Sequence, residues 1–300
     1  MSSWRCPTRD LRHQVIAGAS DAARGPTPCI TAALGPEVRR GPFVFHGRLA
    51  SCLARAQACG FRAVEIFPPS AAALDERALR RGLKRHELTL AAVGTGAGYV
   101  LLRLHLLAAN PRRRAAAVRF IRAVIDCAGA LGAPAVIGSM KGSIPPGVGR
   151  EAAEKRLAET LAELAERAAH HGTTLLLEPL NRYESNCINT LAEGAALIRK
   201  TGAANLRLLA DCFHMNIEET SLPDAIRRAN SWIGHVHFVD SNRRAAGLGH
   251  IDFTAVAAAL RDIGYAGYLS AEALPLPSAA AAAKQTLAAF KEHFFPGPSQ

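Results

Sequence analysis

Four short apolar segments in the second half of the chain each end in a residue of a type that binds metal ions. These residues are Glu178, Asp211, His237 and Glu272, and they follow one another at intervals of 33, 26 and 35 residues. Each interval is about the length of one strand followed by one helix. The carboxyl ends of the strands of a (β/α)8 barrel share one mouth, so four such residues converge if the sheet closes. The spacing therefore predicts an α/β fold, a single (β/α)8 TIM barrel.

The whole chain alternates between short β-like segments and Ala-, Leu- and Arg-rich helical segments. The expected strands are Ile30–Leu34, Ala63–Phe67, Thr89–Val93, Ala135–Gly138, Thr174–Leu177, Leu206–Ala210, His235–Val239 and Tyr268–Ala271. The expected helices are 47–59, 74–86, 111–131, 151–171, 191–201, 222–230, 253–263 and 278–293. Strict alternation of this kind is the pattern of the barrel. We expect a catalytic barrel domain over residues 29–295, preceded by a mobile N-terminal extension over residues 1–28.

The formal net charge of +11 raises the question of a nucleic-acid partner. The arginines are scattered through Ala-rich helices, and no aromatic residues interleave with them to form a stacking platform for bases. We therefore expect no specific nucleic-acid binding. The excess of positive charge is compatible with a small anionic substrate.

Cysteine usage and hydropathy indicate the compartment. The seven cysteines are odd in number, scattered and without a Cys-x-x-Cys pair, which is typical of a reducing environment. No apolar run reaches the roughly 18 residues that a membrane-spanning helix needs. We expect a cytoplasmic protein without a membrane partner, and a homo-oligomer is left open.

Three carboxylates and one imidazole form a donor set for a divalent cation. A lone strand-end glutamate more often forms a salt bridge, but four such residues at one level of a barrel favour a metal centre. Oxygen-rich sites with one imidazole suit Mn²⁺, with Co²⁺ and Mg²⁺ as further candidates, better than a structural zinc. Glu178 and Glu272 end strands on opposite sides of the mouth. Inversion of a carbon beside a ketone needs one carboxylate on each face, so both are candidate catalytic residues.

Four further residues are candidate substrate contacts. His214 lies three residues after Asp211, with a capping or core histidine as the alternative. Arg243 follows the His237 strand, and a solvated loop charge is its alternative. Glu184 either anchors a substrate hydroxyl, orients His214 or forms a surface ion pair. Lys141, in a glycine-containing loop after the fourth strand, could receive a carboxylate or phosphate, with an ordinary turn as the equal alternative.

Several of these stretches resemble a known family. They are Glu178–Glu184 (EPLNRYE), Leu209–Glu219 (LADCFHMNIEE), His237–Arg243 (HFVDSNR) and Glu272–Pro277 (EALPLP). They are similar to the xylose-isomerase-like sugar isomerase/epimerase superfamily, within it to the ketose 3-epimerases, and most of all to the 5-keto-L-gluconate epimerases of inositol catabolism. The resemblance covers about residues 29–293. The segment 35–45 and the stretch after Tyr99 depart from it, so the identity of the sugar is its least secure implication.

The resemblance implies roles for individual residues. Those matching Glu178, Asp211, His237 and Glu272 hold the metal in the family, and those matching Glu178 and Glu272 also transfer protons. Those matching Glu184, His214 and Arg243 bind substrate. The implied activity is inversion of the carbon next to the ketone of a keto-sugar acid or ketose, of the 5-keto-L-gluconate or D-tagaturonate type, through an enediolate.

Other functions remain open at this point. An aldose–ketose isomerase similar to hydroxypyruvate isomerase would use the same metal and carboxylates. A non-catalytic sugar-binding protein would not need two opposed carboxylates. An apurinic-site endonuclease of the same superfamily is disfavoured, because the chain reads His250-Ile-Asp252 where such nucleases use Asp-x-His.

Overall fold

The computed structural model describes residues 25–38 and 41–295. Residues 1–24 of the predicted N-terminal extension lie outside the described residues, so mobility there stays a prediction. The first strand begins at Thr27, just inside the predicted end of that extension.

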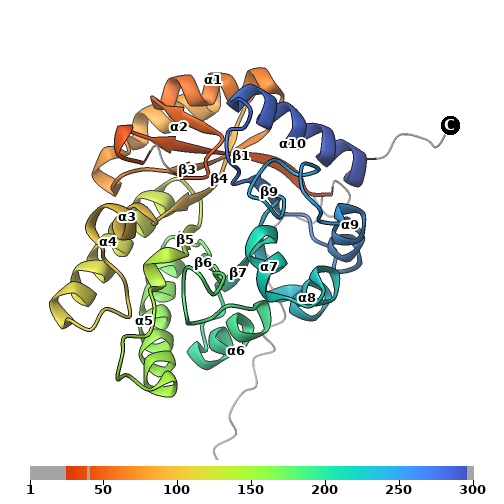
Figure 1. Ribbon diagram of the computed structural model, residues 1–300. Helices are drawn as coiled ribbons and strands as arrows, with labels where there is room; N and C mark the ends of the chain where they lie inside the picture. The colour runs from red at the N-terminus through yellow and green to blue at the C-terminus, as the bar shows by residue number, and fades with distance from the viewer. Residues whose placement is uncertain (1–24, 39–40, 296–300) are drawn as a thin grey trace, which may run out of the picture.

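Within residues 25–38 and 41–295, nine strands form one parallel sheet in the order β2-β1-β3-β4-β5-β6-β7-β8-β9. Their bounds are β1 Thr27–Leu34, β2 Phe45–Gly47, β3 Ala63–Phe67, β4 Thr89–Gly94, β5 Ala135–Ile137, β6 Leu175–Leu177, β7 Leu206–Asp211, β8 Ile233–His237 and β9 Tyr268–Ala271. Pairing of β1 with β9 closes eight of them into a barrel, and β2 pairs with Ala32–Leu34 of β1, beyond the stretch of β1 that pairs with β9. The predicted (β/α)8 barrel is thereby confirmed (Figure 1).

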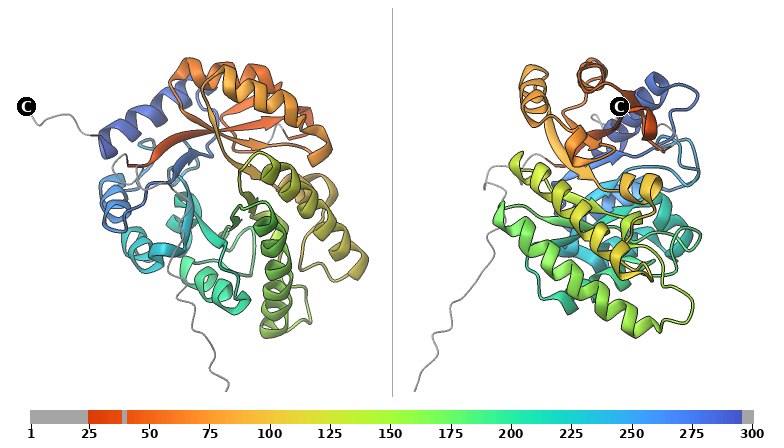
Figure 2. Two further views of the ribbon diagram at one scale, coloured as in Figure 1. Left: turned by 180° about the vertical axis from the view of Figure 1, so that it is seen from behind. Right: turned by 90° about the vertical axis from the view of Figure 1, so that its left-hand side faces the viewer.

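The helices lie outside the sheet, as Figure 2 shows from two further sides. Their bounds are α1 Leu49–Cys59, α2 Glu76–Arg85, α3 Ala97–Leu102, α4 Pro111–Ala130, α5 Arg150–His170, α6 Leu191–Thr201, α7 Cys212–Glu218, α8 Leu222–Ala229, α9 Phe253–Asp262 and α10 Ala279–Phe294. Local sequence sets several starts. Thr190 and Glu193 form a capping box before α6, and Asn110 caps α4 ahead of Pro111.

Alternation along the strands separates two apolar layers. One large core lies between the sheet and the helices. Inside the ring, Ala92, Val136, Leu176 and Leu209 from four neighbouring strands form a cluster of their own. Side chains with period two point alternately to the helices and to the barrel axis. The same alternation decides which polar residues reach the mouth.

All eight predicted strands and eight predicted helices are present; β3, β9 and α6 have the predicted bounds, and the others have shifted ends. Strand β1 starts at Thr27 and not at Ile30, and both ends of β8 are shifted, because it runs from Ile233 to His237 and not from His235 to Val239. Short elements that the sequence did not predict are β2, α3 and α7. Among the residues that the structure describes, none of the helices combines the length and apolar character needed to cross a bilayer.

Candidate active site and metal centre

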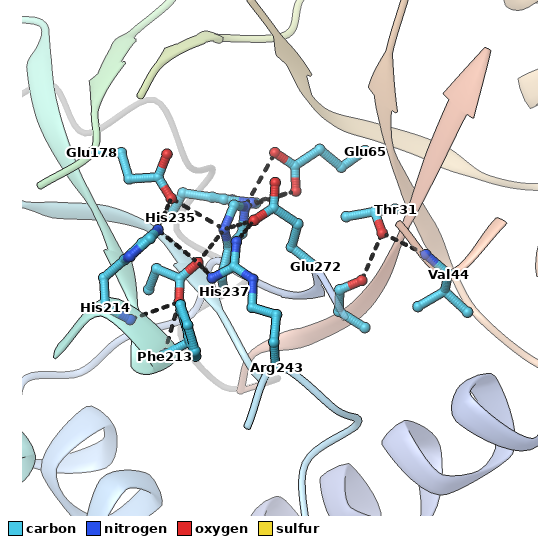
Figure 3. A network of polar contacts seen from close by, with 12 residues as sticks. Thr31, Val44, Glu65, Glu178, Phe213, His214, His235, His237, Arg243 and Glu272 are labelled. Atoms are coloured by element: carbon cyan, nitrogen blue, oxygen red, sulfur yellow. Dashed lines mark hydrogen bonds and ion pairs between the residues drawn. The ribbon is translucent and has the colours of Figure 1, made fainter. Parts of the chain in front are cut away.

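The four predicted metal ligands meet at the carboxyl ends of β6, β7, β8 and β9. One donor atom from each of Glu178, Asp211, His237 and Glu272 lies within 4.8 Å of the others, and all four residues are buried. Figure 3 shows the side chains of Glu178, His237 and Glu272 pointing toward one another with the guanidinium of Arg243 among them. The fold therefore assembles the four-residue cluster that the spacing predicted, and we call this cluster the candidate metal centre.

Glu178 follows β6 directly, and its backbone N–H donates to the carbonyl of Ile137 at 3.0 Å. This bond continues the pairing of β6 with β5 by one residue. The carboxylate packs against Gly138, where a Cβ would lie 2.1 Å from Oε2. The other oxygen, Oε1, is buried without a hydrogen-bond partner among the described residues and lies 3.5 Å from Nδ1 of His237. An unpartnered buried carboxylate oxygen is costly, so this oxygen fits the role of a ligand to a cation.

Asp211 ends β7 and also starts α7. Its Oδ1 accepts hydrogen bonds from the backbone N–H groups of Phe213 at 2.8 Å and His214 at 3.3 Å, which caps the helix. Its Oδ2 faces the cluster, 3.1 Å from Nδ1 of His237 and 2.7 Å from a guanidinium nitrogen of Arg243. Burial alone would raise the pKa of Asp211, but the charges of Arg243 and His214 and the hydrogen bond with His237 together outweigh it and hold that pKa well below its usual range.

Glu272 follows β9, whose end is tied to β1. The Thr31 hydroxyl donates to the carbonyl of Ala271 at 2.7 Å and accepts from the N–H of Val44 at 3.2 Å (Figure 3). The Glu272 carboxylate forms an ion pair with Arg243. Burial raises the pKa of Glu272 to about 8, against the opposing effect of that guanidinium.

Arg243 lies on the loop after β8, which Asp240 organises. The fully buried carboxylate of Asp240 accepts from the N–H groups of Ser241, Gly247 and Ile251 at 2.7, 2.8 and 3.2 Å. Arg243 has a left-handed backbone, φ 61°, and its guanidinium lies 4.7 Å from the centre of the Phe213 ring. The loop is therefore built to direct this side chain into the mouth.

His214 and Glu184 lie beside the cluster. The N–H of Asn181 and its side-chain amide lie 3.3 and 2.8 Å from Nδ1 of His214, so the backbone donor makes Nδ1 an acceptor. The ring proton then sits on Nε2, 3.8 Å from Glu178. Glu184 accepts from the same amide at 3.2 Å, lies 3.9 Å from Nδ1 and leaves half of its side chain exposed. This geometry favours a role of Glu184 in orienting His214 over a surface ion pair. Contact of Glu184 with a substrate hydroxyl stays a prediction.

Lys141 lies in the short 3-10 helix Ser139–Lys141 after β5 and is fully buried. Its Nζ has no hydrogen-bond partner among the described residues. Burial lowers the pKa of Lys141 to about 8, partly offset by the negative charge of Glu178. An unpaired buried ammonium group is costly, which distinguishes Lys141 from the solvent-exposed residues of most turns, and its contact with a substrate stays a prediction.

Sequence reasoning missed Glu65, a fully buried carboxylate in the middle of β3. It lies 3.1 Å from Nε2 of His235 and 3.2 Å from Nε2 of His237 (Figure 3). Burial alone would raise the pKa of Glu65, but the two imidazoles outweigh it and hold that pKa well below its usual range. The available signal was one charged residue in an otherwise apolar strand, AVEIF.

The candidate metal centre fits a divalent cation on its own geometry. Three carboxylates are gathered in a buried space, and Arg243 is the guanidinium paired with two of them. The lone oxygen of Glu178 and Nδ1 of His237 both face the middle of the cluster. Oxygen ligands with one imidazole suit a hard or borderline divalent ion.

The closed parallel sheet and its outer helices make this protein a (β/α)8 barrel. Three carboxylates and one imidazole at the carboxyl ends of its strands form a candidate metal centre. More particularly, the chain belongs to the xylose isomerase-like TIM barrel family, whose model matches residues 53–293. The predicted family is thus confirmed. The special likeness to 5-keto-L-gluconate epimerases stays a prediction.

Two relatives and one solved structure illustrate the range of the family. The chain is 50% identical over 117 residues to an L-ribulose 3-epimerase from Mesorhizobium japonicum, a match that spans 39% of each protein. It is 32% identical over 226 residues to a 2-oxo-tetronate isomerase from Cupriavidus necator, covering 74% of this chain and 85% of that one. A solved L-ribulose 3-epimerase superposes with a TM-score of 0.72 at 31% identity, over 82% of this chain and 88% of that one.

Proposed function

We propose that this protein is a metal-dependent sugar epimerase that inverts the carbon next to the ketone of a ketose or keto-sugar acid. The observation that carries the proposal is the buried cluster of Glu178, Asp211, His237 and Glu272 at the mouth of the barrel. Its two glutamates come from β6 and β9, so they approach a bound substrate from different sides. The likeness to an L-ribulose 3-epimerase supports the same reading.

The two glutamates carry the proton transfers in this proposal. One carboxylate takes the proton from the carbon beside the ketone, which leaves an enediolate of the substrate, and the other returns a proton to the opposite face. A bound divalent ion supplies Lewis-acid stabilisation of the negative charge that develops on the substrate oxygens. Asp211 and His237 hold the remaining ligand positions and take no proton from the substrate.

Arg243 and His214 provide hydrogen-bond donors at the same place. The His214 ring presents its Nε2–H toward the carboxylates, because Nδ1 accepts from Asn181. Arg243 is held at the mouth by its loop and by Phe213. Preorganised donors are worth most where negative charge develops, here at the ketone oxygen. Glu184 is the proposed partner for a substrate hydroxyl.

The substrate class rests on Lys141. Its buried, unpartnered ammonium group lies near Glu178 and could neutralise a carboxylate at the far end of the substrate. A neutral sugar offers no group that needs this charge. We therefore propose a keto-sugar acid of the 5-keto-L-gluconate or D-tagaturonate type, with free ketoses as poorer substrates.

Mn²⁺ is the proposed ion, with Co²⁺ and Mg²⁺ as substitutes, because three carboxylates outnumber the single imidazole. The proposed partner is a small molecule, with no specific nucleic acid, and the proposed compartment is the cytoplasm. Exhaustive dialysis against a chelator should abolish turnover, and added Mn²⁺ should restore it.

An aldose–ketose isomerase is the second candidate. The 32% identity to a 2-oxo-tetronate isomerase over most of both chains favours it. The same carboxylates would then move the proton between neighbouring carbons and not back to one carbon.

Incubation of a panel of ketoses and keto-sugar acids in D₂O with Mn²⁺, read by NMR, decides between the two. Deuterium at the carbon beside the ketone together with inversion supports the epimerase. Aldose formation with deuterium at C2 of the aldose, or at C1 of the recovered ketose, supports the isomerase. Lys141→Met should raise the KM for keto-sugar acids far more than for D-tagatose or D-fructose, and equal losses on both would remove the keto-acid assignment.

A further inference from the structure

Glu65 is a buried carboxylate that the proposed reaction does not use. It lies in the middle of β3, and Val64 and Ile66 on either side pack into the core between sheet and helices. Because side chains alternate along a strand, Glu65 must point into the barrel. A carboxylate in such a place is costly to bury unless it is paired and hydrogen-bonded.

Two histidines of β8 meet Glu65 inside the barrel. Val236 between them packs against the helices, so His235 and His237 both point inward. The Nε2 atom of His235 lies 3.1 Å from Oε2 of Glu65. The Nε2 atom of His237 lies 3.2 Å from Oε2 and 3.4 Å from Oε1 of the same carboxylate (Figure 3).

The two ring nitrogens of His237 therefore face different groups. Nδ1 faces the candidate metal centre, 3.1 Å from Asp211 and 3.5 Å from each of Glu178 and Glu272. Nε2 faces Glu65. An ionised carboxylate can only accept a hydrogen bond, so Nε2 has to carry a hydrogen. With a divalent cation among the carboxylates the imidazole is neutral, and its one ring hydrogen on Nε2 leaves the lone pair on Nδ1 for that ion.

We propose that Glu65 is a positioning residue that fixes His237 in the Nε2–H tautomer and so presents Nδ1 as a metal ligand. The inference rests on the metal centre of the proposed function. His235 acts as the second donor to the carboxylate and keeps it aimed at His237. Hydrogen bonds to the far nitrogen of a ligating histidine generally fix the ring orientation and strengthen the ligand.

The same three residues could be read as a second metal site, because their donor atoms also lie within 4.8 Å of one another. The geometry disfavours this reading. Glu65 already satisfies both Nε2–H groups with hydrogen bonds. An ion there would need Nε2 of His237 bare, and the remaining ring hydrogen would then move to Nδ1 and remove a ligand from the first centre.

Glu65→Gln tests the inference by metal binding alone. An amide offers one acceptor and one donor group to two Nε2–H groups, so one histidine must change tautomer or lose its partner. Calorimetric titration of the metal-free protein with Mn²⁺ should give one ion per chain in the wild type and binding weaker by about 10- to 100-fold in the variant. A smaller change in affinity overturns the inference, and two ions per wild-type chain favour the second site instead.

Glu219→Gln is the matched control, since it also removes one partly buried carboxylate while its Oε1 contact with the N–H of Leu191 can persist. It should leave the affinity for Mn²⁺ unchanged. If the wild type binds no divalent ion, the proposed function fails. If it binds one and Glu65→Gln binds equally well, only the role of Glu65 fails.

A second measurement needs no variant, in case Glu65→Gln does not fold. Histidine ¹⁵N NMR of the Mg²⁺-loaded wild type should show His237 with a protonated Nε2 and a hydrogen-free Nδ1. A hydrogen on Nδ1 would contradict the proposal.

Discussion

The two halves of the barrel contribute different things to one site. The half from β6 to β9 supplies the four candidate ligands, one at the end of each strand. The half from β1 to β5 supplies what holds them. Thr31 ties down the end of β9, Glu65 faces the far side of His237, and Gly138 leaves room for Glu178. The difference teaches that chemistry-bearing residues can be confined to half of a closed sheet while their placement depends on the other half.

The largest effect should come from the half that carries the ligands. Glu178→Gln and Glu272→Gln each remove a proton acceptor and a ligand charge, so kcat/KM should fall by about 10²- to 10⁴-fold while the fold persists. Glu166→Gln, an exposed site on α5, is the control. Epimerisation assays paired with circular dichroism would measure this. Activity above about a hundredth of wild type in either variant contradicts the two-carboxylate mechanism.

Lys141, which follows β5, tests whether the half from β1 to β5 buries a positive charge that lowers the stability of the fold. Its pKa is lowered to about 8 in the folded protein, against about 10.4 in the unfolded chain. Below pH 8 the folded state buries an ammonium ion, so Lys141→Met should be more stable than wild type by up to about 3 kcal/mol. As the pH rises from 8 to about 10.5 the unfolded chain holds more protons, wild-type stability rises, and the gap should close.

Urea unfolding of both proteins at pH 7 and pH 10 measures that gap. The exposed Lys155→Met gives the baseline. A gap that is constant with pH would show that Lys141 has the same pKa in the folded and the unfolded chain, as a well-paired ammonium group could have.

Gly138, which follows β5, tests whether Glu178 needs the space that the missing side chain of this glycine leaves. Alanine there would place its Cβ 2.1 Å from Oε2 of Glu178, so the carboxylate has to move. A displacement of about 1 Å can cost about 10²-fold in turnover, and we expect a loss of that order. Gly149→Ala, whose Cβ meets nothing within 4 Å, should be close to wild type. Equal kcat values in the two variants would mean that Glu178 tolerates a different position.

Thr31 should give the smallest effect. Valine keeps the shape but leaves the carbonyl of Ala271 and the N–H of Val44 without their buried partner. The free energy of unfolding should fall by about 1–2 kcal/mol, with a modest loss of kcat through Glu272. Chemical unfolding measures the first and the epimerase assay the second. The control is Thr160→Val on α5, where the hydroxyl bonds within its own helix; an equal effect there would remove the special role of Thr31.

The cluster of candidate ligands could be predicted from the sequence because each of them ends or follows an apolar strand, at the spacing of barrel units. The residues that hold these candidate ligands in place could not be predicted in this way. Glu65 has its partner His235 170 positions along the chain, and only closure of the sheet brings them together. Helix α7 was missed because it has seven residues and starts on the Asp211 carboxylate. The burial of Lys141 likewise depends on neighbours that no local pattern names.

Closure of the barrel also brings the first and last described residues side by side. A Cβ built on Gly25 would lie 3.5 Å from the Phe295 ring. Gly25 precedes the amino end of β1, so this contact lies on the face of the barrel opposite the candidate active site. A short linker between these positions would permit circular permutation, with new termini opened in an exposed loop. Attachment to a solid support through that face would leave the mouth open to substrate.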